Sequence, residues 1–173
     1  MKRVTRLIAV LCTAVLLAAA PVWAQQSWNP TASDGSDDTA GGTGALTSTC
    51  EGTNCGGNTA FGAYALPNGF SGSNSAFGVF ALGSEGDGNA NTAVGSQAME
   101  SDQDSNDNTA IGADALQKNN GGDYNTAAGT WALDSNTTGS SNTAIGTLAL
   151  YSNSTGGANV ASGYSAYCIT PPG

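Results

Sequence analysis

One nine-residue phrase recurs along most of the chain and constrains its fold more than any other feature. The phrase is Asn-Thr-Ala-apolar-Gly-x-x-Ala-Leu, and clear copies start at Asn58, Asn74, Asn91, Asn108, Asn125, Asn142 and Asn159. The first of the intervals between them is 16 residues and the other five are 17. A degenerate copy starts at Asp38, so that the array covers residues 38–167. A near-constant period of this length predicts that each repeat is one structural unit stacked on the next.

The positions of the repeat differ in how far their residues vary. The third and eighth positions are Ala and the fifth is Gly in all eight copies, and the ninth is Leu except for Met99 and Tyr167. The fourth position is mostly bulky and the seventh varies freely. We expect the fixed positions, together with the bulky fourth one, to face a packed interior or a tight bend. The variable seventh position should face solvent or a partner.

The residue types of the repeat favour strands over helices. Every copy carries Gly inside the phrase, and the linkers between copies are rich in Asn, Ser, Thr and Gly, as in residues 134–141. These residues favour bends and disfavour helix interiors. The phrase predicts a strand of about four residues, a bend at Gly, and a second short strand that carries Ala and Leu. We therefore predict an all-β fold, a parallel β-solenoid (β-roll) of about eight 17-residue repeats.

The ends of the chain differ from the repeats. Residues 1–24 have a basic start, an apolar run from Leu7 to Ala20 and small residues before Gln25, which is typical of a signal peptide cleaved after Ala24. The alternative is a membrane span, but this run is shorter than the roughly 20 residues that a span needs. Residues 25–37 form an acidic, flexible lead-in, and residues 168–173 form a C-terminal tail. We expect a secreted or cell-surface protein with no membrane span in the mature chain.

Export places the cysteines of the mature chain in an oxidising environment. Cys50 and Cys55 lie five residues apart among glycines, which favours a disulfide that closes a small loop. A metal pair is the alternative, although no second pair and no His is present to complete four ligands. Cys168 is then the odd thiol, with a partner that the sequence does not identify.

The charge and the missing residue types exclude two functional classes. Lys118 is the single basic residue after Arg6 and stands against 13 acidic residues, so that we expect no nucleic-acid binding. The sequence has no His, which removes the usual base for activating a Ser or Cys nucleophile. The acidic residues lie mostly in the variable linkers. We therefore predict that the protein is not an enzyme and has no cofactor, with calcium as the one candidate ion.

The calcium candidate is the linker of residues 100–108. Asp102, Asp104 and Asn106 match the opening of a calcium loop, and Asp107 adds a further carboxylate. The sixth place of the loop lacks Gly, and Ala113 stands where a Glu should be the twelfth residue. A solvated acidic turn is the alternative interpretation.

The second position of the repeat is Thr in most copies, as in Thr109 and Thr143. Flat Thr arrays on a solenoid can order water and bind ice. No second Thr array lies two residues away, and we expect buried Thr side chains that bond to the neighbouring backbone. Ice binding is kept as an alternative function.

The interior of such a solenoid is small. Two Ala, one Leu and one bulky residue per repeat bury little apolar area against an ordering cost of roughly 1–2 kcal/mol per residue. Association of chains side by side, with the bulky fourth or the ninth position covered, would make up this deficit, and we expect a homo-oligomer. The seventh position forms a candidate contact surface, either between chains or toward a ligand, made of Tyr64, Phe80, Trp131 and Leu148.

The phrase Asn142-Thr143-Ala144-Ile145-Gly146 and its sister copies resemble the head repeats of trimeric autotransporter adhesins, the YadA-like heads. Those heads carry Asn-Ser-Val-Ala-Ile-Gly in a left-handed parallel β-roll with three chains to a head. The resemblance covers residues 38–167 but not a coiled-coil stalk or a barrel anchor, for which we see no heptads or barrel strands. The period of 17 is longer than that of the heads and implies larger loops.

The resemblance implies an exported structural or adhesive surface module, a homotrimer that binds an extracellular protein or glycan. A calcium-dependent or ice-binding solenoid is the alternative, as is a structural surface subunit without a ligand.

Overall fold

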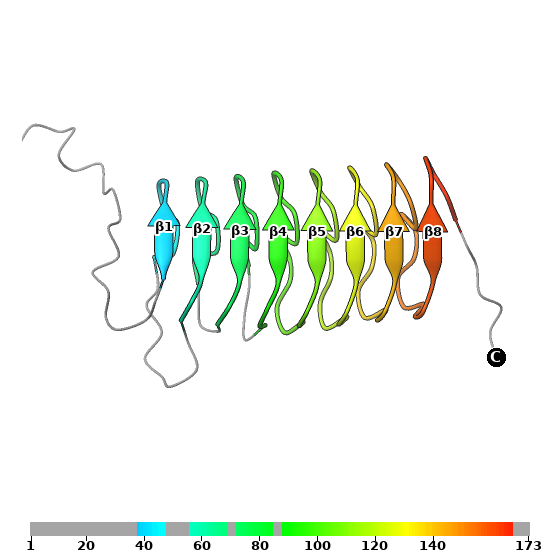
Figure 1. The fold of residues 1–173 in the computed structure, drawn as a ribbon, viewed down its shortest axis with the longest axis horizontal. Helices are drawn as coiled ribbons and strands as arrows, with labels where there is room; N and C mark the ends of the chain where they lie inside the picture. The colour runs from blue at the N-terminus through cyan, green and yellow to red at the C-terminus, as the bar shows by residue number, and fades with distance from the viewer. Residues whose placement is uncertain (1–37, 48–55, 69–71, 85–87, 168–173) are drawn as a thin grey trace, which may run out of the picture.

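The computed structural model describes residues 38–47, 56–68, 72–84 and 88–167 (Figure 1). The predicted signal peptide, the acidic lead-in, the Cys50–Cys55 disulfide and the tail with Cys168 lie outside these residues and stay predictions.

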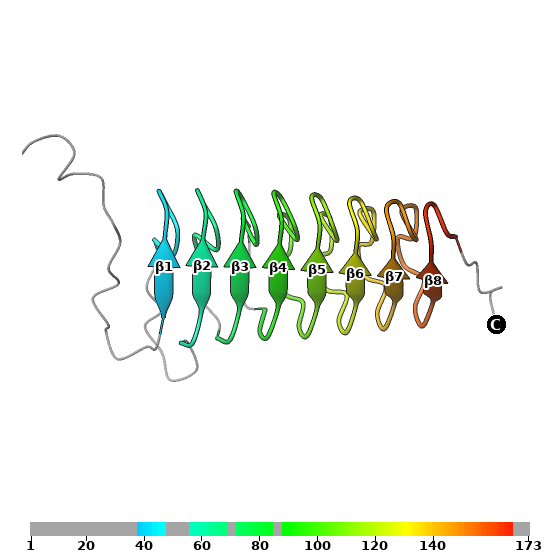
Figure 2. The same cartoon turned by 45° about the horizontal axis from the view of Figure 1, so that its top comes forward.

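The described residues form one parallel sheet of eight strands, arranged in the order in which they follow along the chain. Figures 1 and 2 show the strands side by side along the length of the molecule, each joined to the next by one coil of chain. The strands are β1 (Thr39–Gly41), β2 (Thr59–Phe61), β3 (Ser75–Phe77), β4 (Thr92–Val94), β5 (Thr109–Ile111), β6 (Thr126–Ala128), β7 (Thr143–Ile145) and β8 (Val160–Ser162). The predicted parallel β-solenoid of 17-residue coils is confirmed.

Equivalent residues of neighbouring coils are in register. Ala60 pairs with Ala76 and Ala76 pairs with Ala93, and the same pairing continues to Ala161. Hydrogen bonds between coils therefore run along the axis of the solenoid, as in the 2.8 Å bond from the Thr92 amide to the Asn108 carbonyl. The interval of 16 residues before Asn74 leaves this register intact.

Each coil turns at the Gly of the fifth position. Gly112 has a φ of +138°, and a Cβ added there would lie 2.6 Å from the carbonyl carbon and oxygen of Gly129. Residues with a side chain rarely adopt this backbone angle. The space is also too small for a side chain, because the glycines of successive coils stack directly on one another. This explains why the position is Gly in every copy.

The expected second strand is absent from the described residues, where Ala and Leu of the eighth and ninth positions lie in turns. The seventh and ninth residues have positive φ, for example 58° at Trp131 and 53° at Leu133, and extended strands do not adopt such angles. Hydrogen bonds between coils still continue here, as from the Leu116 amide to the Ala132 carbonyl at 3.0 Å.

The interior holds the two Ala positions and the ninth position, and these are fully buried through most of the solenoid. The bulky fourth position is not part of it, so that our assignment of this position to the interior was wrong. Since side chains alternate along a strand, an inward Ala at the third position turns the second and fourth outward. In β5, Ala110 is buried while Ile111 is exposed.

Buried Asn side chains at the first position take the place that we had assigned to the bulky residue. Asn108 is fully buried, and its Oδ1 accepts a 2.8 Å hydrogen bond from the backbone amide of Asn125 in the next coil. The same bond links Asn74 to Asn58 and Asn159 to Asn142. The interior is therefore held together by a column of amides as well as by apolar packing.

Candidate functional site

The outward face of the sheet carries an apolar column at the fourth position. Phe61 and Phe77 stack with ring centroids 5.8 Å apart and an angle of 11° between the rings. Five residues of this column are between 37% and 50% exposed, namely Phe61, Phe77, Val94, Ile111 and Ile145. Because the strands are in register, these side chains form a nearly continuous apolar stripe along the solenoid, interrupted by Ala128.

The second position lies beside this stripe on the same outward face. Most Thr side chains here are half-buried, as at Thr92, Thr109 and Thr143, and Thr126 is exposed. The expectation that these side chains are buried was wrong, for the same reason of alternation along the strand. The outer face of the sheet thus combines a hydroxyl column with an apolar column.

The candidate contact surface at the seventh position is only partly brought together. Tyr64 and Phe80 stack with centroids 5.2 Å apart and an interplanar angle of 6°. Trp131 is exposed, whereas Leu148 is half-buried. Successive coils stack, so that Gln97 and Asp114 of the same position separate the aromatic pair from Trp131. The four residues therefore form two separate groups.

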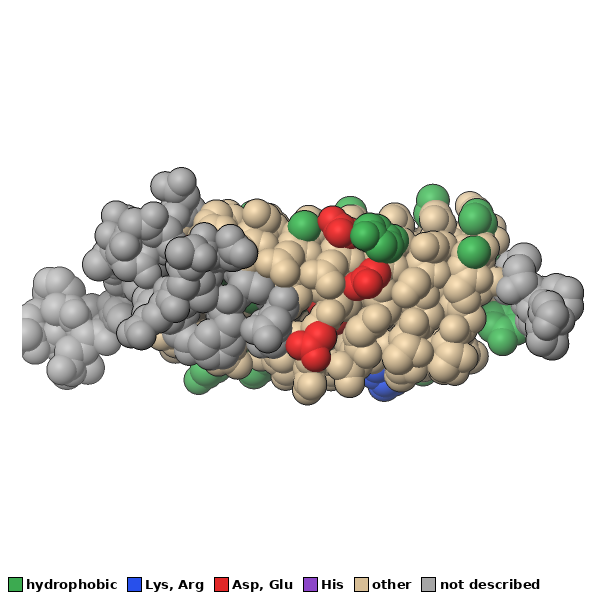
Figure 3. All heavy atoms as spheres, turned by 90° about the horizontal axis from the view of Figure 1, so that it is seen from below, with side chains coloured by type: hydrophobic (Ala, Val, Ile, Leu, Met, Phe, Trp, Pro, Cys, Tyr) green, Lys and Arg blue, Asp and Glu red, His purple; other side chains and the backbone are tan. Residues whose placement is uncertain are grey.

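The calcium candidates face different environments. Asp102 is fully buried, Asp104 and Asp107 are exposed, and Asn106 is half-buried with its Oδ1 accepting a 3.0 Å bond from the Asn89 amide. Figure 3 shows acidic side chains gathered midway along one face of the solenoid. In the part of the chain that the structure describes, no three Cys, Asp or Glu side chains form a group that could hold a metal ion.

Asp102 is the most unusual of these residues because it is buried at a position that Asn119, Asn136 and Asn153 occupy in the next three coils. Its Oδ1 accepts hydrogen bonds from the hydroxyl of Ser105 and, at 3.5 Å, from Nδ2 of Asn119, while its Oδ2 has no partner. Burial raises the pKa of Asp102 to about 7, and the bonds from Ser105 and Asn119 oppose this rise. The side chain is thus placed inward, away from any ion in solvent.

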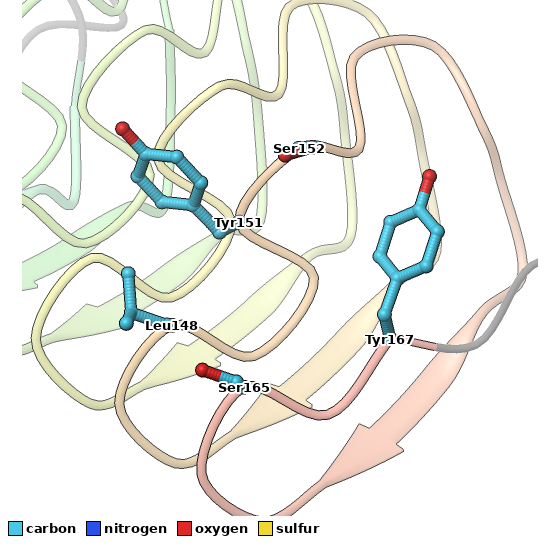
Figure 4. Close-up of a pocket in the computed structure, with 5 residues that line it drawn as sticks. All are labelled: Leu148, Tyr151, Ser152, Ser165 and Tyr167. Atoms are coloured by element: carbon cyan, nitrogen blue, oxygen red, sulfur yellow. The ribbon is translucent and has the colours of Figure 1, made fainter.

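One open pocket lies near the C-terminal end of the solenoid, with a cavity volume of about 420 Å³. It is lined by Leu148, Tyr151, Ser152, Ser165 and Tyr167, and none of these belongs to a strand. Figure 4 shows the rings of Tyr151 and Tyr167 standing apart with Ser152 between them in this view, and Leu148 and Ser165 below them.

Sequence reasoning identified one of these residues, Leu148, but not the pocket. Tyr167 was the available signal, since it takes the ninth position, where the other coils have a buried Leu or Met, and is itself exposed. The replacement of Leu by Tyr at the ninth position of the last coil thus marks the pocket.

Comparison with known proteins gives no match to a family, to a curated protein or to a solved structure. Residues 38–47, 56–68, 72–84 and 88–167 contain no helix long and apolar enough to cross a membrane.

Proposed function

We propose that this chain is an exported structural and adhesive surface module that works as a homo-oligomer. Copies of the chain, three as in the adhesin heads that it resembles, pack with the outer faces of their sheets together. The module then presents its remaining surfaces to extracellular ligands.

The observation that carries this proposal is the apolar stripe on the outer face of a parallel sheet. Parallel sheets are normally covered on both faces. Here the coil covers the inner face, while the outer face leaves Phe61, Val94 and Ile145 exposed. An exposed apolar surface that extends over several neighbouring strands is typical of a protein contact.

A second copy suits this surface because its own stripe has the same length and repeat. Two identical solenoids that align along their axes bring together the same apolar side chains of β2, β3, β4, β5 and β7. The hydroxyls of the Thr column lie beside the contact and can bond across it. None of the eight strands contains a charged residue, so that the strands bring no like charges into such a contact.

Sedimentation velocity of the unmodified chain and of Ile111→Asp tests the proposal. We expect a trimer mass for the unmodified chain and a large shift toward monomer for Ile111→Asp, because the variant buries a carboxylate in the contact. Tyr124→Asp is the matched control, since Tyr124 is exposed outside the strands, and it should keep the trimer. A folded monomer in all three samples would refute the proposal.

A second candidate function, ice binding, gains support from the outward Thr column. Thr92, Thr109, Thr126 and Thr143 are in register on one face at strand spacing, which is about 4.8 Å. Thermal hysteresis of a monomeric sample that Thr109→Leu abolishes would favour this function over association. Absence of hysteresis would dismiss it.

A further inference from the structure

The pocket at the C-terminal end combines apolar and hydroxyl-bearing side chains. Tyr151 and Tyr167 are 40% and 56% exposed, so that the rings are accessible to a ligand, and Leu148 adds an apolar wall. Ser152 and Ser165 supply hydroxyls that donate and accept hydrogen bonds. None of these five lining residues, all from the described part of the chain, is charged.

These features specify the chemistry of a ligand. A cavity of about 420 Å³ has the size of a small-ligand site. A neutral lining disfavours an ionised ligand, because no opposite charge offsets its desolvation. A phenol ring offers an apolar face with a polar tip, which suits a molecule that is itself apolar on one face and hydroxylated at its edge. Pyranose sugars have this character.

The distribution of charged residues favours a neutral sugar over an acidic one. Lys118 is the single basic residue after Arg6, and residues 135–173, to which all the lining residues belong, have no charged side chain. Lys118 is engaged at 2.7 Å with the carboxylate of Asp134. An anionic glycan would therefore find no basic side chain among the lining residues to offset its desolvation, whereas a neutral glycan needs none.

We propose that the pocket formed by Leu148, Tyr151, Ser152, Ser165 and Tyr167 binds a neutral hexose unit of a glycan. The sugar lies between the two phenol rings, and its hydroxyls bond to Ser152 and Ser165. This inference rests on the adhesive part of the proposed function and gives it a ligand class. It does not require association of chains, because all five residues come from one chain and none lies on the sheet.

Saturation-transfer difference NMR on the whole chain tests the inference with the methyl glycosides of glucose, galactose, mannose, N-acetylglucosamine and fucose. We expect transfer to the ring protons of at least one of them and none to the methyl glycoside of N-acetylneuraminic acid. Tyr151→Ala and Tyr167→Ala should each weaken binding by about tenfold, and Tyr167→Phe should retain it because the ring remains.

Tyr124→Ala is the matched control, since Tyr124 is an exposed tyrosine in a linker remote in sequence from the pocket. It should leave the transfer unchanged. The inference is overturned if no neutral glycoside shows transfer, or if transfer persists in both Tyr→Ala variants while circular dichroism shows them folded. Sugar binding by a monomeric sample would uphold the pocket and reject self-association, so that the two failures are distinguishable.

Discussion

The side-chain nitrogen of Asn119 lies 3.5 Å from Oδ1 of Asp102, the residue that occupies the same position one coil earlier. The next two coils repeat this relation, with bonds from Asn136 to Asn119 at 2.8 Å and from Asn153 to Asn136 at 3.0 Å. Each Asn also donates from Nδ2 to the carbonyl three residues later, as Asn136 does to Gly139 at 2.8 Å. Asp102 has an oxygen in place of that donor, and its Oδ2 is buried without a partner.

Replacing Asp102 by Asn should stabilise the protein at high pH. The pKa of this carboxyl is raised from 3.8 to about 7 in the folded state, so that folding favours its protonated form. Below pH 4 the carboxyl is protonated in both the folded and the unfolded state and does not change the free energy of unfolding. As the pH rises from 4 to 7 the free energy of unfolding falls, and above pH 7 it stays at the lower value. The shift corresponds to roughly 4 kcal/mol at pH 8, and Asp102→Asn should recover most of it.

Urea unfolding of both proteins at pH 4 and pH 8 measures this effect. The gain in unfolding free energy should be present at pH 8 and absent at pH 4. Asp104→Asn is the control, because it removes an exposed carboxylate from the same linker, and it should not reproduce the gain of Asp102→Asn at pH 8. Parallel pH profiles for the unmodified chain and Asp102→Asn would contradict the account.

Removing one amide from the first-position column should be costly. Asn108→Ala deletes the acceptor for the Asn125 amide and the donor that lies 2.8 Å from the Ser105 hydroxyl. Buried groups left without partners predict a loss of roughly 2–4 kcal/mol in the free energy of unfolding. Asn120→Ala, at an exposed Asn, should change it by less than about 0.5 kcal/mol. Equal effects in chemical denaturation would rule out a structural role for the column.

Two glycines with positive φ should respond differently to Ala. At Gly112 a Cβ would lie 2.6 Å from the backbone of the next coil, whereas at Gly121, with φ of +100°, it would meet nothing within 4 Å. Gly121→Ala should cost about 1–2 kcal/mol from backbone strain alone. Gly112→Ala should cost several kcal/mol more, since two coils must separate. Thermal unfolding of both variants checks this, and similar melting temperatures would argue against direct stacking of the glycines.

Calcium should leave the stability unchanged. Asp102 faces inward, and the exposed Asp104 and Asp107 form no group of three acidic side chains within the described residues. The melting temperature should therefore be the same in millimolar calcium and in chelator. A rise with calcium that Asp104→Asn removes would instead establish the calcium-dependent alternative.

The repeat itself made the solenoid predictable. An invariant Gly and Ala at a period of 17 leave few folds, and the pairing of Ala60 with Ala76 and of Ala76 with Ala93 confirms the expected register. Which side chains point into the interior was harder to predict. A bulky residue such as Ile111 suggests an interior, but a coil this narrow accommodates Ala on the strand, and the polar Asn108 is buried instead.

The candidate sites were less predictable because they arise from departures from the repeat. The pocket depends on Tyr167 and Tyr151, which belong to the last two coils only. The raised pKa of Asp102 depends on its place in a column of Asn that becomes visible once linkers are aligned by coil. Neither follows from a local motif.

Association through the outer face of the sheet is the central claim, and the dependence of unfolding on protein concentration tests it most directly. If three chains share the stripe of Phe61, Phe77, Val94, Ile111 and Ile145, the thermal midpoint followed by circular dichroism should rise with chain concentration. A midpoint that stays constant over a thousandfold dilution, with the chain folded throughout, would show that one chain is stable alone and would contradict the account.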